Sequence, residues 1–100
     1  MIIYEVNIEI DAEIVNEFDV WLDDYIHTML QFEGFNSAKK LNSIENNKYY
    51  LTVQYNIVSQ EDLDRYLRNH AQTMREDCLK RFADKFRAHR RIMKTIKIYS

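Results

Sequence analysis

The sequence predicts an α+β protein of the ferredoxin-like type, a βαββαβ sandwich in which two helices cover one face of a four-stranded antiparallel sheet. Apolar residues alternate along four segments, which is typical of strands with one buried face. They recur at three- and four-residue spacing along two other segments, which is typical of amphipathic helices. The 100 residues are 46% apolar, so we expect one core and a single domain over residues 1–100.

The first strand and the first helix have the plainest patterns. Strict alternation over residues 2–10 predicts a strand whose buried face carries Tyr4, Val6, Ile8 and Ile10. A helix over about residues 12–31 follows, with Asp11 suited to cap its start and Gly34 suited to stop it. Its apolar stripe consists of Ile14, Phe18, Trp21, Leu22, Tyr25, Ile26 and Met29.

A hairpin is expected next. Residues 35–45 form a strand with imperfect alternation, which a bulge near Ala38 would reconcile. Asn46 and Asn47 suit the turn because asparagine tolerates a positive φ angle. Residues 48–57 then alternate clearly. Tyr49, Leu51, Val53, Tyr55 and Ile57 share one face, of which Leu51, Val53 and Tyr55 are expected to face the helices.

The second helix is predicted over residues 60–88, opened by Ser59 and Asp62 in an approximate capping box. Its apolar stripe contains Leu63, Tyr66, Leu67, Ala71 and Met74, and continues through Cys78, Phe82 and Phe86. Such a helix would be about 43 Å long, whereas a ten-residue strand reaches only about 33 Å. We therefore expect a break or bend near residues 73–78, followed by a last strand over residues 91–99.

The sheet face away from the helices is expected to be mixed in character. It would carry Ile3, Glu5, Asn7, Glu9, Tyr50, Thr52, Gln54, Asn56, Met93, Thr95, Lys97 and Tyr99. Since no helix of the same chain can cover this face, we expect a homodimer formed through it. The residues expected to line a cavity or bind a ligand between the two sheets are Asn7, Tyr50, Thr52 and Gln54. Single-stranded RNA could instead stack on such a face, but Tyr4, the aromatic residue that would stack, falls on the buried side.

The whole chain resembles a family of bacterial proteins of about a hundred residues and unknown function. The resemblance rests on Ile2-Ile3-Tyr4-Glu5-Val6-Asn7-Ile8, the Gly34-Phe35 step, the strand from Tyr50 to Tyr55, and the run containing His70-Ala71, Met74-Arg75, Arg81-Phe82, Phe86 and Arg90-Arg91-Ile92. That family is placed in the dimeric α+β-barrel superfamily, similar to antibiotic-biosynthesis monooxygenases. The resemblance thus implies a ferredoxin-like fold and a homodimer with sheets paired face to face.

The resemblance leaves two enzymatic alternatives open. Some relatives oxidise substrates without a bound cofactor, and others degrade haem with an asparagine on the first strand, a tryptophan and a helical histidine. This chain has Asn7, Trp21 and His70, but nothing aligns them with those roles. No metal-ligand spacing, nucleotide-binding motif or catalytic constellation is present, so no catalytic residue, metal or cofactor is expected.

The charges are distributed unevenly along the chain. Residues 1–34 carry nine acidic residues and no Lys or Arg, whereas residues 75–100 carry nine basic and three acidic residues. The basic end could contact an anion or an acidic partner through Arg87, Arg90 and Arg91. Alternatively, the acidic and basic ends lie beside each other within the fold or across a dimer.

These observations favour a ligand-binding or interaction and regulatory module over an enzyme. The net charge of −2 argues against a dedicated nucleic-acid-binding protein. One cysteine excludes an internal disulfide, and no apolar run is long enough to span a membrane. No signal peptide is visible at the start, so we expect a cytoplasmic protein.

Overall fold

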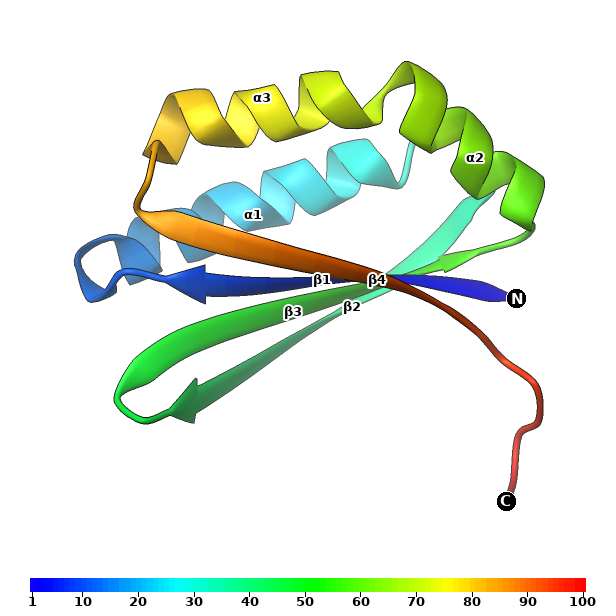
Figure 1. Ribbon diagram of the computed structural model, residues 1–100, viewed down its shortest axis with the longest axis horizontal. Coiled ribbons are helices and arrows are strands. Elements are labelled where there is room, and N and C mark those ends of the chain that lie inside the picture. The colour runs from blue at the N-terminus through cyan, green and yellow to red at the C-terminus, as the bar shows by residue number, and fades with distance from the viewer.

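A computed structural model describes residues 1–100 and has the predicted ferredoxin-like topology (Figure 1). Its elements are β1 (Ile2–Ile10), the 3₁₀ turn η1 (Ala12–Ile14), α1 (Val15–Met29), β2 (Phe35–Glu45), β3 (Lys48–Ile57), α2 (Gln60–Asn69), α3 (Ala71–Phe82) and β4 (Phe86–Lys94). The strands form one antiparallel sheet in the order β2-β3-β1-β4. All three helices lie on one side of it, which leaves an open face on the other side. None of these helices is long and apolar enough to cross a membrane.

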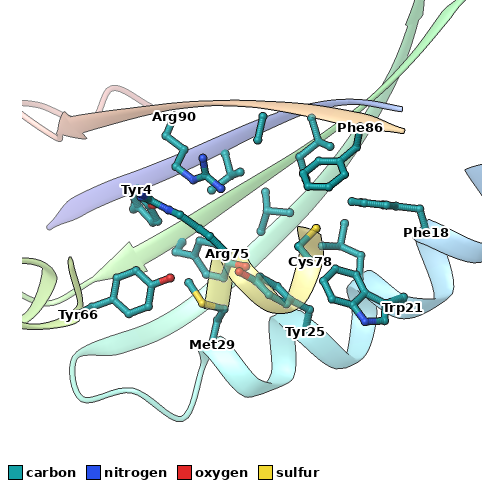
Figure 2. Close-up of a pocket in the computed structure, with 16 residues that line it drawn as sticks. Tyr4, Phe18, Trp21, Tyr25, Met29, Tyr66, Arg75, Cys78, Phe86 and Arg90 are labelled. Carbon is teal, nitrogen blue, oxygen red and sulfur yellow. The ribbon is translucent and has the colours of Figure 1, made fainter. Parts of the chain in front are cut away.

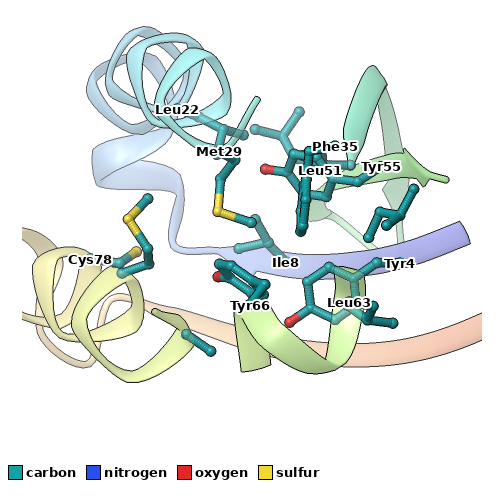
Figure 3. Packing of buried hydrophobic residues seen from close by; sticks show 14 of the residues in the cluster. Tyr4, Ile8, Leu22, Met29, Phe35, Leu51, Tyr55, Leu63, Tyr66 and Cys78 are labelled. Carbon is teal, nitrogen blue, oxygen red and sulfur yellow. The ribbon is translucent and has the colours of Figure 1, made fainter. Parts of the chain in front are cut away.

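The core fills the space between the helices and the central strands β1 and β3 (Figure 3). Tyr4 lies opposite Tyr55 and Ile8 opposite Leu51 in the β1–β3 register, and all four are buried. The predicted stripe of α1 supplies three fully buried residues, Phe18, Leu22 and Met29. The remaining helices add Leu63, Tyr66, Ala71, Met74, Cys78 and Phe82. The alternation and the helical spacing therefore identified most of the core.

The break in the second helix lies earlier than predicted. It falls at His70, between α2 and α3, three residues before the range near which it was expected, 73–78. The helix also stops at Phe82 instead of residue 88, because Ala83 takes a positive φ of 52° and turns the chain. Neither a glycine nor a proline marks either point, so the sequence carries no ordinary stop signal there.

The prediction for the last strand was wrong in its position. The strand covers Phe86–Lys94 rather than 91–99, and Ile96 and Ile98, expected in the core, are 94% and 84% exposed. Thr95, Lys97 and Tyr99 also lie beyond the sheet and not on its open face. The residues of β4 opposite the open-face positions Ile3, Glu5, Asn7 and Glu9 are Met93, Arg91, His89 and Arg87.

The hairpin of β2 and β3 has the predicted turn. Asn46 and Asn47 both have positive φ angles, 52° and 63°. The irregularity in β2 lies between Phe35 and Ser37, where the register with β3 shifts, one residue before the Ala38 position near which a bulge was predicted.

Candidate functional site

The predicted ligand-contacting residues Asn7, Tyr50, Thr52 and Gln54 do lie together on the open face of the sheet. Asn7 is directly opposite Thr52 in the β1–β3 register, and the Thr52 hydroxyl donates a 2.8 Å hydrogen bond to the Asn7 side-chain oxygen. The Gln54 amide donates to Glu5 at 2.8 Å, and the Tyr50 hydroxyl donates to Glu9 at 3.3 Å. These polar groups are thus already hydrogen-bonded to one another across the two strands.

Glu5 is at the centre of this network and is only 3% exposed, although it faces away from the helices. Its carboxylate accepts hydrogen bonds from Asn7, Gln54 and Arg91. These hydrogen bonds, together with the positive charge of Arg91, lower the pKa of Glu5 to about 2, against the opposing effect of burial. The open face therefore holds a permanently ionised, well-satisfied carboxylate at neutral pH.

The three arginines predicted as an anion or acidic-partner contact are not brought together. Arg87 pairs with Glu9 at 2.7 Å and with Asp11 at 2.6 Å, and Arg91 pairs with Glu5, all on the open side. Arg90 points to the opposite side of β4, opposite Val6 in the β1–β4 register, and has no ion-pair partner. The acidic and basic ends of the chain do lie beside each other, since Arg81 and Lys85 also pair with Glu17 and Glu13.

A second candidate site lies between the sheet and the helices (Figure 2). An inner cavity of about 30 Å³ is enclosed by side chains of β1, β3, β4, α1, α2 and α3. Next to it, a more open groove of about 240 Å³ lies between α3 and β4. We call this second space the binding groove; it is lined by Arg75, Cys78, Leu79, Phe86, Ala88 and Arg90. All of these residues except Leu79 also line the inner cavity, so the two spaces adjoin.

The lining of the inner cavity is apolar except for tyrosine hydroxyls and two guanidinium groups. Fourteen of its 16 lining residues are hydrophobic, and none is Asp, Glu or His. The four tyrosines among them are Tyr4, Tyr25, Tyr55 and Tyr66. Burial raises the pKa of Tyr25, Tyr55 and Tyr66, and raises that of the Cys78 thiol to about 12. At neutral pH these four groups are therefore protonated and neutral.

Arg75 is held in this lining by one neutral partner. Its Nη2 donates a 3.0 Å hydrogen bond to the Tyr4 hydroxyl, while its Nε is buried and has no hydrogen-bond partner. Buried donors of this kind are rare in folded proteins, because an unpaired buried N–H costs free energy. Arg75, a residue of the groove lining, therefore carries a donor that the protein itself leaves unused.

Sequence reasoning missed Arg75 and grouped Arg90 with two arginines that lie on the other face of β4. Arg75 directly follows Met74 of the apolar stripe, and Arg90 alternates with Ala88 and Phe86, which pack toward the helices. With the strand predicted to begin at residue 91, this alternation could not be recognised. A strand start at Phe86 would have placed Arg90 on the helix side and Arg87 and Arg91 on the open side.

The residues that the haem-degrading alternative would use do not converge. Trp21 lines the inner cavity, whereas Asn7 lies on the open face. His70 stands at the junction of α2 and α3, stacked on Phe32 with ring centroids 4.5 Å apart, and lines neither the inner cavity nor the binding groove. No three His, Cys, Asp or Glu side chains are grouped so that they could hold a metal ion.

Comparison with known proteins identifies a family and a fold. The family described as "Domain of unknown function (DUF4286)" matches residues 1–96. No curated protein sequence matches the chain.

Three solved structures are similar to the chain over nearly its whole length. SnoaB, a cofactor-independent oxygenase from Streptomyces nogalater, has 11% sequence identity and a TM-score of 0.71, with 97% of this chain and 95% of that chain covered. An EthD family protein from Bacillus halodurans has 18% identity and a TM-score of 0.71, with 96% and 100% covered. A protein of Deinococcus radiodurans described as an antibiotic biosynthesis monooxygenase has 18% identity and a TM-score of 0.62, with both chains covered completely. These likenesses show the fold alone, the βαββαβ ferredoxin-like sandwich described above.

Proposed function

Since the chain belongs to the DUF4286 family, we propose for this member a small-molecule-binding module that is homodimeric through the open face of its sheet. The observation that carries the proposal is the binding groove, which adjoins an inner cavity with an apolar lining and a few convergent polar groups. Ligand sites in proteins generally have this combination of apolar walls and a small number of orienting polar groups.

The size of the groove favours a small ligand. About 240 Å³ is available between α3 and β4, while the adjoining inner cavity offers only about 30 Å³, roughly the space of a single water molecule. The ligand would therefore occupy the groove and extend at most a small group inward, next to Cys78 and Phe86. A macromolecular partner would not fit this space.

The lining supports binding more than proton-transfer chemistry. A general base must be able to take up a proton near the working pH. The groove and the inner cavity offer arginines, which stay charged, and tyrosines and a cysteine whose pKa values are raised. For this reason the oxygenase activity stated in the name of SnoaB is not carried over to this chain.

Dimerisation is supported by the open face. Proteins of this fold are typically dimeric. Ile3, Tyr50 and Met93 are half-buried on a side of the sheet where no helix lies (Figure 1). Pairing two such faces would bury these side chains and place Asn7, Tyr50, Thr52 and Gln54 between the two sheets, where they remain the predicted polar contacts.

Ligand binding is tested by NMR titration with small aromatic molecules, with the Trp21 indole N–H as the reporter. Trp21 is the only tryptophan and lines the inner cavity. We expect its resonance to shift with 3-phenylpropionate, and the shift to be lost in Ala88→Leu, which fills the groove. The matched control is Ala12→Leu at an exposed position of η1. An unchanged Trp21 resonance in the unsubstituted protein contradicts the binding proposal.

The dimer is tested by sedimentation equilibrium at micromolar concentration. We expect a mass of twice 12.2 kDa for the unsubstituted chain and a monomer for Met93→Glu. Ile92→Glu, one residue away on the other side of β4 and 48% exposed, should stay dimeric. A single 12.2 kDa species for the unsubstituted chain refutes the dimer without affecting the groove.

A further inference from the structure

We propose that the ligand of the binding groove is an anion, a carboxylate carried on a small apolar body, and that Arg75 and Arg90 hold its charge. This inference rests on the proposed function and specifies its ligand. Arg75 approaches from α3 and Arg90 from β4, and both line the groove as well as the inner cavity (Figure 2).

The two arginines differ from the other basic residues of comparable burial. Four basic residues of the chain are half-buried: Arg65, Arg75, Lys85 and Arg90. Arg65 pairs with Glu33, Glu61 and Asp62, and Lys85 pairs with Glu13 at 2.7 Å. Arg75 and Arg90 have no carboxylate within ion-pair distance, and no acidic residue lines the groove. The groove is therefore the part of the molecule where positively charged side chains are partly buried without a negatively charged partner.

Such an arrangement costs free energy unless an anion completes it. Withdrawing a charge from water is unfavourable unless it is paired and hydrogen-bonded. The hydrogen bond from Arg75 to the Tyr4 hydroxyl supplies an acceptor but no negative charge, and the Arg75 Nε remains unpartnered. A carboxylate from solution would provide both the acceptor and the charge.

The chemistry of the groups present favours a carboxylate. A guanidinium group offers two parallel N–H donors that match the two oxygens of a carboxylate. Tyr25 and Tyr66 line the adjoining inner cavity, and burial raises their pKa, so they stay neutral and add no negative charge that would compete with an anion. The body of the ligand would contact the apolar walls formed by Leu79, Phe86 and Ala88.

Two probes that differ only in charge separate the contribution of the carboxylate to binding from that of the apolar body. 3-Phenylpropionate and 3-phenylpropanamide have the same skeleton, and only the first is an anion at pH 7. In the NMR titration on the Trp21 indole N–H, we expect the acid to bind at least tenfold more tightly than the amide. We expect Arg75→Gln and Arg90→Gln each to reduce that preference to less than threefold.

The controls keep the test independent of folding. Arg68→Gln removes a charge from an exposed position of α2 that makes no ion pair, and should leave the preference unchanged. Arg75→Lys retains the charge but lacks the paired donors, so it should keep part of the preference even if Arg75→Gln is unstable. Inorganic phosphate, which has no apolar body, should not displace 3-phenylpropionate at equal concentration.

The outcomes distinguish this inference from the proposal on which it rests. If the acid and the amide shift Trp21 with equal affinity, the groove binds small molecules but the anion inference is overturned. The same holds if phosphate competes equally or if Arg68→Gln abolishes the preference as fully as Arg90→Gln. If neither probe shifts Trp21, the binding proposal itself fails.

Discussion

Arg91 donates from its Nε to the Glu5 carboxylate at 2.5 Å, directly across the β4–β1 register. The pair joins the basic end of the chain to its acidic beginning on the face of the sheet that no helix covers. Glu5 is buried there by its neighbours on β1, β3 and β4, so its charge is satisfied by the protein rather than by water.

Glu5 should make the free energy of unfolding depend on pH. Its pKa of about 2 in the folded protein lies below its ordinary value of 4.5, so the stabilisation is fully present above pH 4.5 and is lost as the pH falls toward 2. We expect Glu5→Gln to lower the free energy of unfolding at pH 7 by about 1–3 kcal/mol and to flatten its fall in acid. Urea titrations across this pH range check the prediction. The control is Glu45→Gln, at an exposed position. If the free energy of unfolding has the same pH dependence in the unsubstituted protein and in both variants, the prediction for Glu5 is wrong.

Gly34 should not tolerate a side chain. Its φ is +85°, and a Cβ built there would lie 2.3 Å from the carboxyl carbon of Asp62, in the first turn of α2. We expect Gly34→Ala to lose about 1–3 kcal/mol or more of stability, because both the backbone and the contact become strained. Thermal unfolding measures the loss. Asn36→Ala, two residues along and exposed, should change the melting temperature little.

Removing the side chain of Ala83 should stabilise the folded protein. It ends α3 with φ of 52° and ψ of −123°, a conformation that costs an alanine roughly 1–3 kcal/mol. Ala83→Gly relieves this strain and should raise the free energy of unfolding by about 1 kcal/mol. At the exposed Ala12, where φ is negative, the same substitution should lower it. Destabilisation by Ala83→Gly in chemical unfolding would show that the residue is not strained.

Ser59 should act as the cap of α2. Its hydroxyl oxygen accepts a hydrogen bond from the Asp62 backbone N–H at 3.2 Å, and the hydroxyl donates to the Asp62 carboxylate at 2.9 Å. We expect Ser59→Ala to cost about 1 kcal/mol, whereas Ser43→Ala on the exposed strand β2 should be nearly neutral. Amide hydrogen exchange in the first turn of α2 should accelerate in the former variant alone, and unchanged protection there would contradict the capping role.

Prediction from the sequence succeeded where local pattern alone decides the structure. β1, β3 and the stripe of α1 follow directly from residue spacing, and the Asn46-Asn47 turn from side-chain chemistry. It failed at the end of the second helix and for the last strand, because Ala83 adopts a glycine-like conformation without being a glycine. The turn at this residue starts the last strand at Phe86, so Arg87 and Arg90 fall within the strand, on opposite faces, although the sequence had placed them before it.

The candidate site depends on several elements at once and could not be obtained in the same way. Arg75 and Arg90 belong to different elements and line one groove only because α3 packs over β4. Neither residue belongs to a motif, and a half-buried arginine without an acidic partner can be recognised only after every carboxylate has been placed. The open-face residues were easier to predict, since Asn7, Thr52 and Gln54 follow from strand alternation.

The pairing of the two chain ends also bears on how the protein is made. β1 lies between β3 and β4, and the contacts of Lys85, Arg87 and Arg91 with acidic residues near β1 span 72 to 86 residues of sequence. During synthesis on the ribosome, one edge of β1 therefore stays without its neighbour until almost all of this domain has been translated. The nascent chain exposes an unpaired, acidic strand edge through that interval, and its negative charges disfavour premature pairing with a second copy of the same strand.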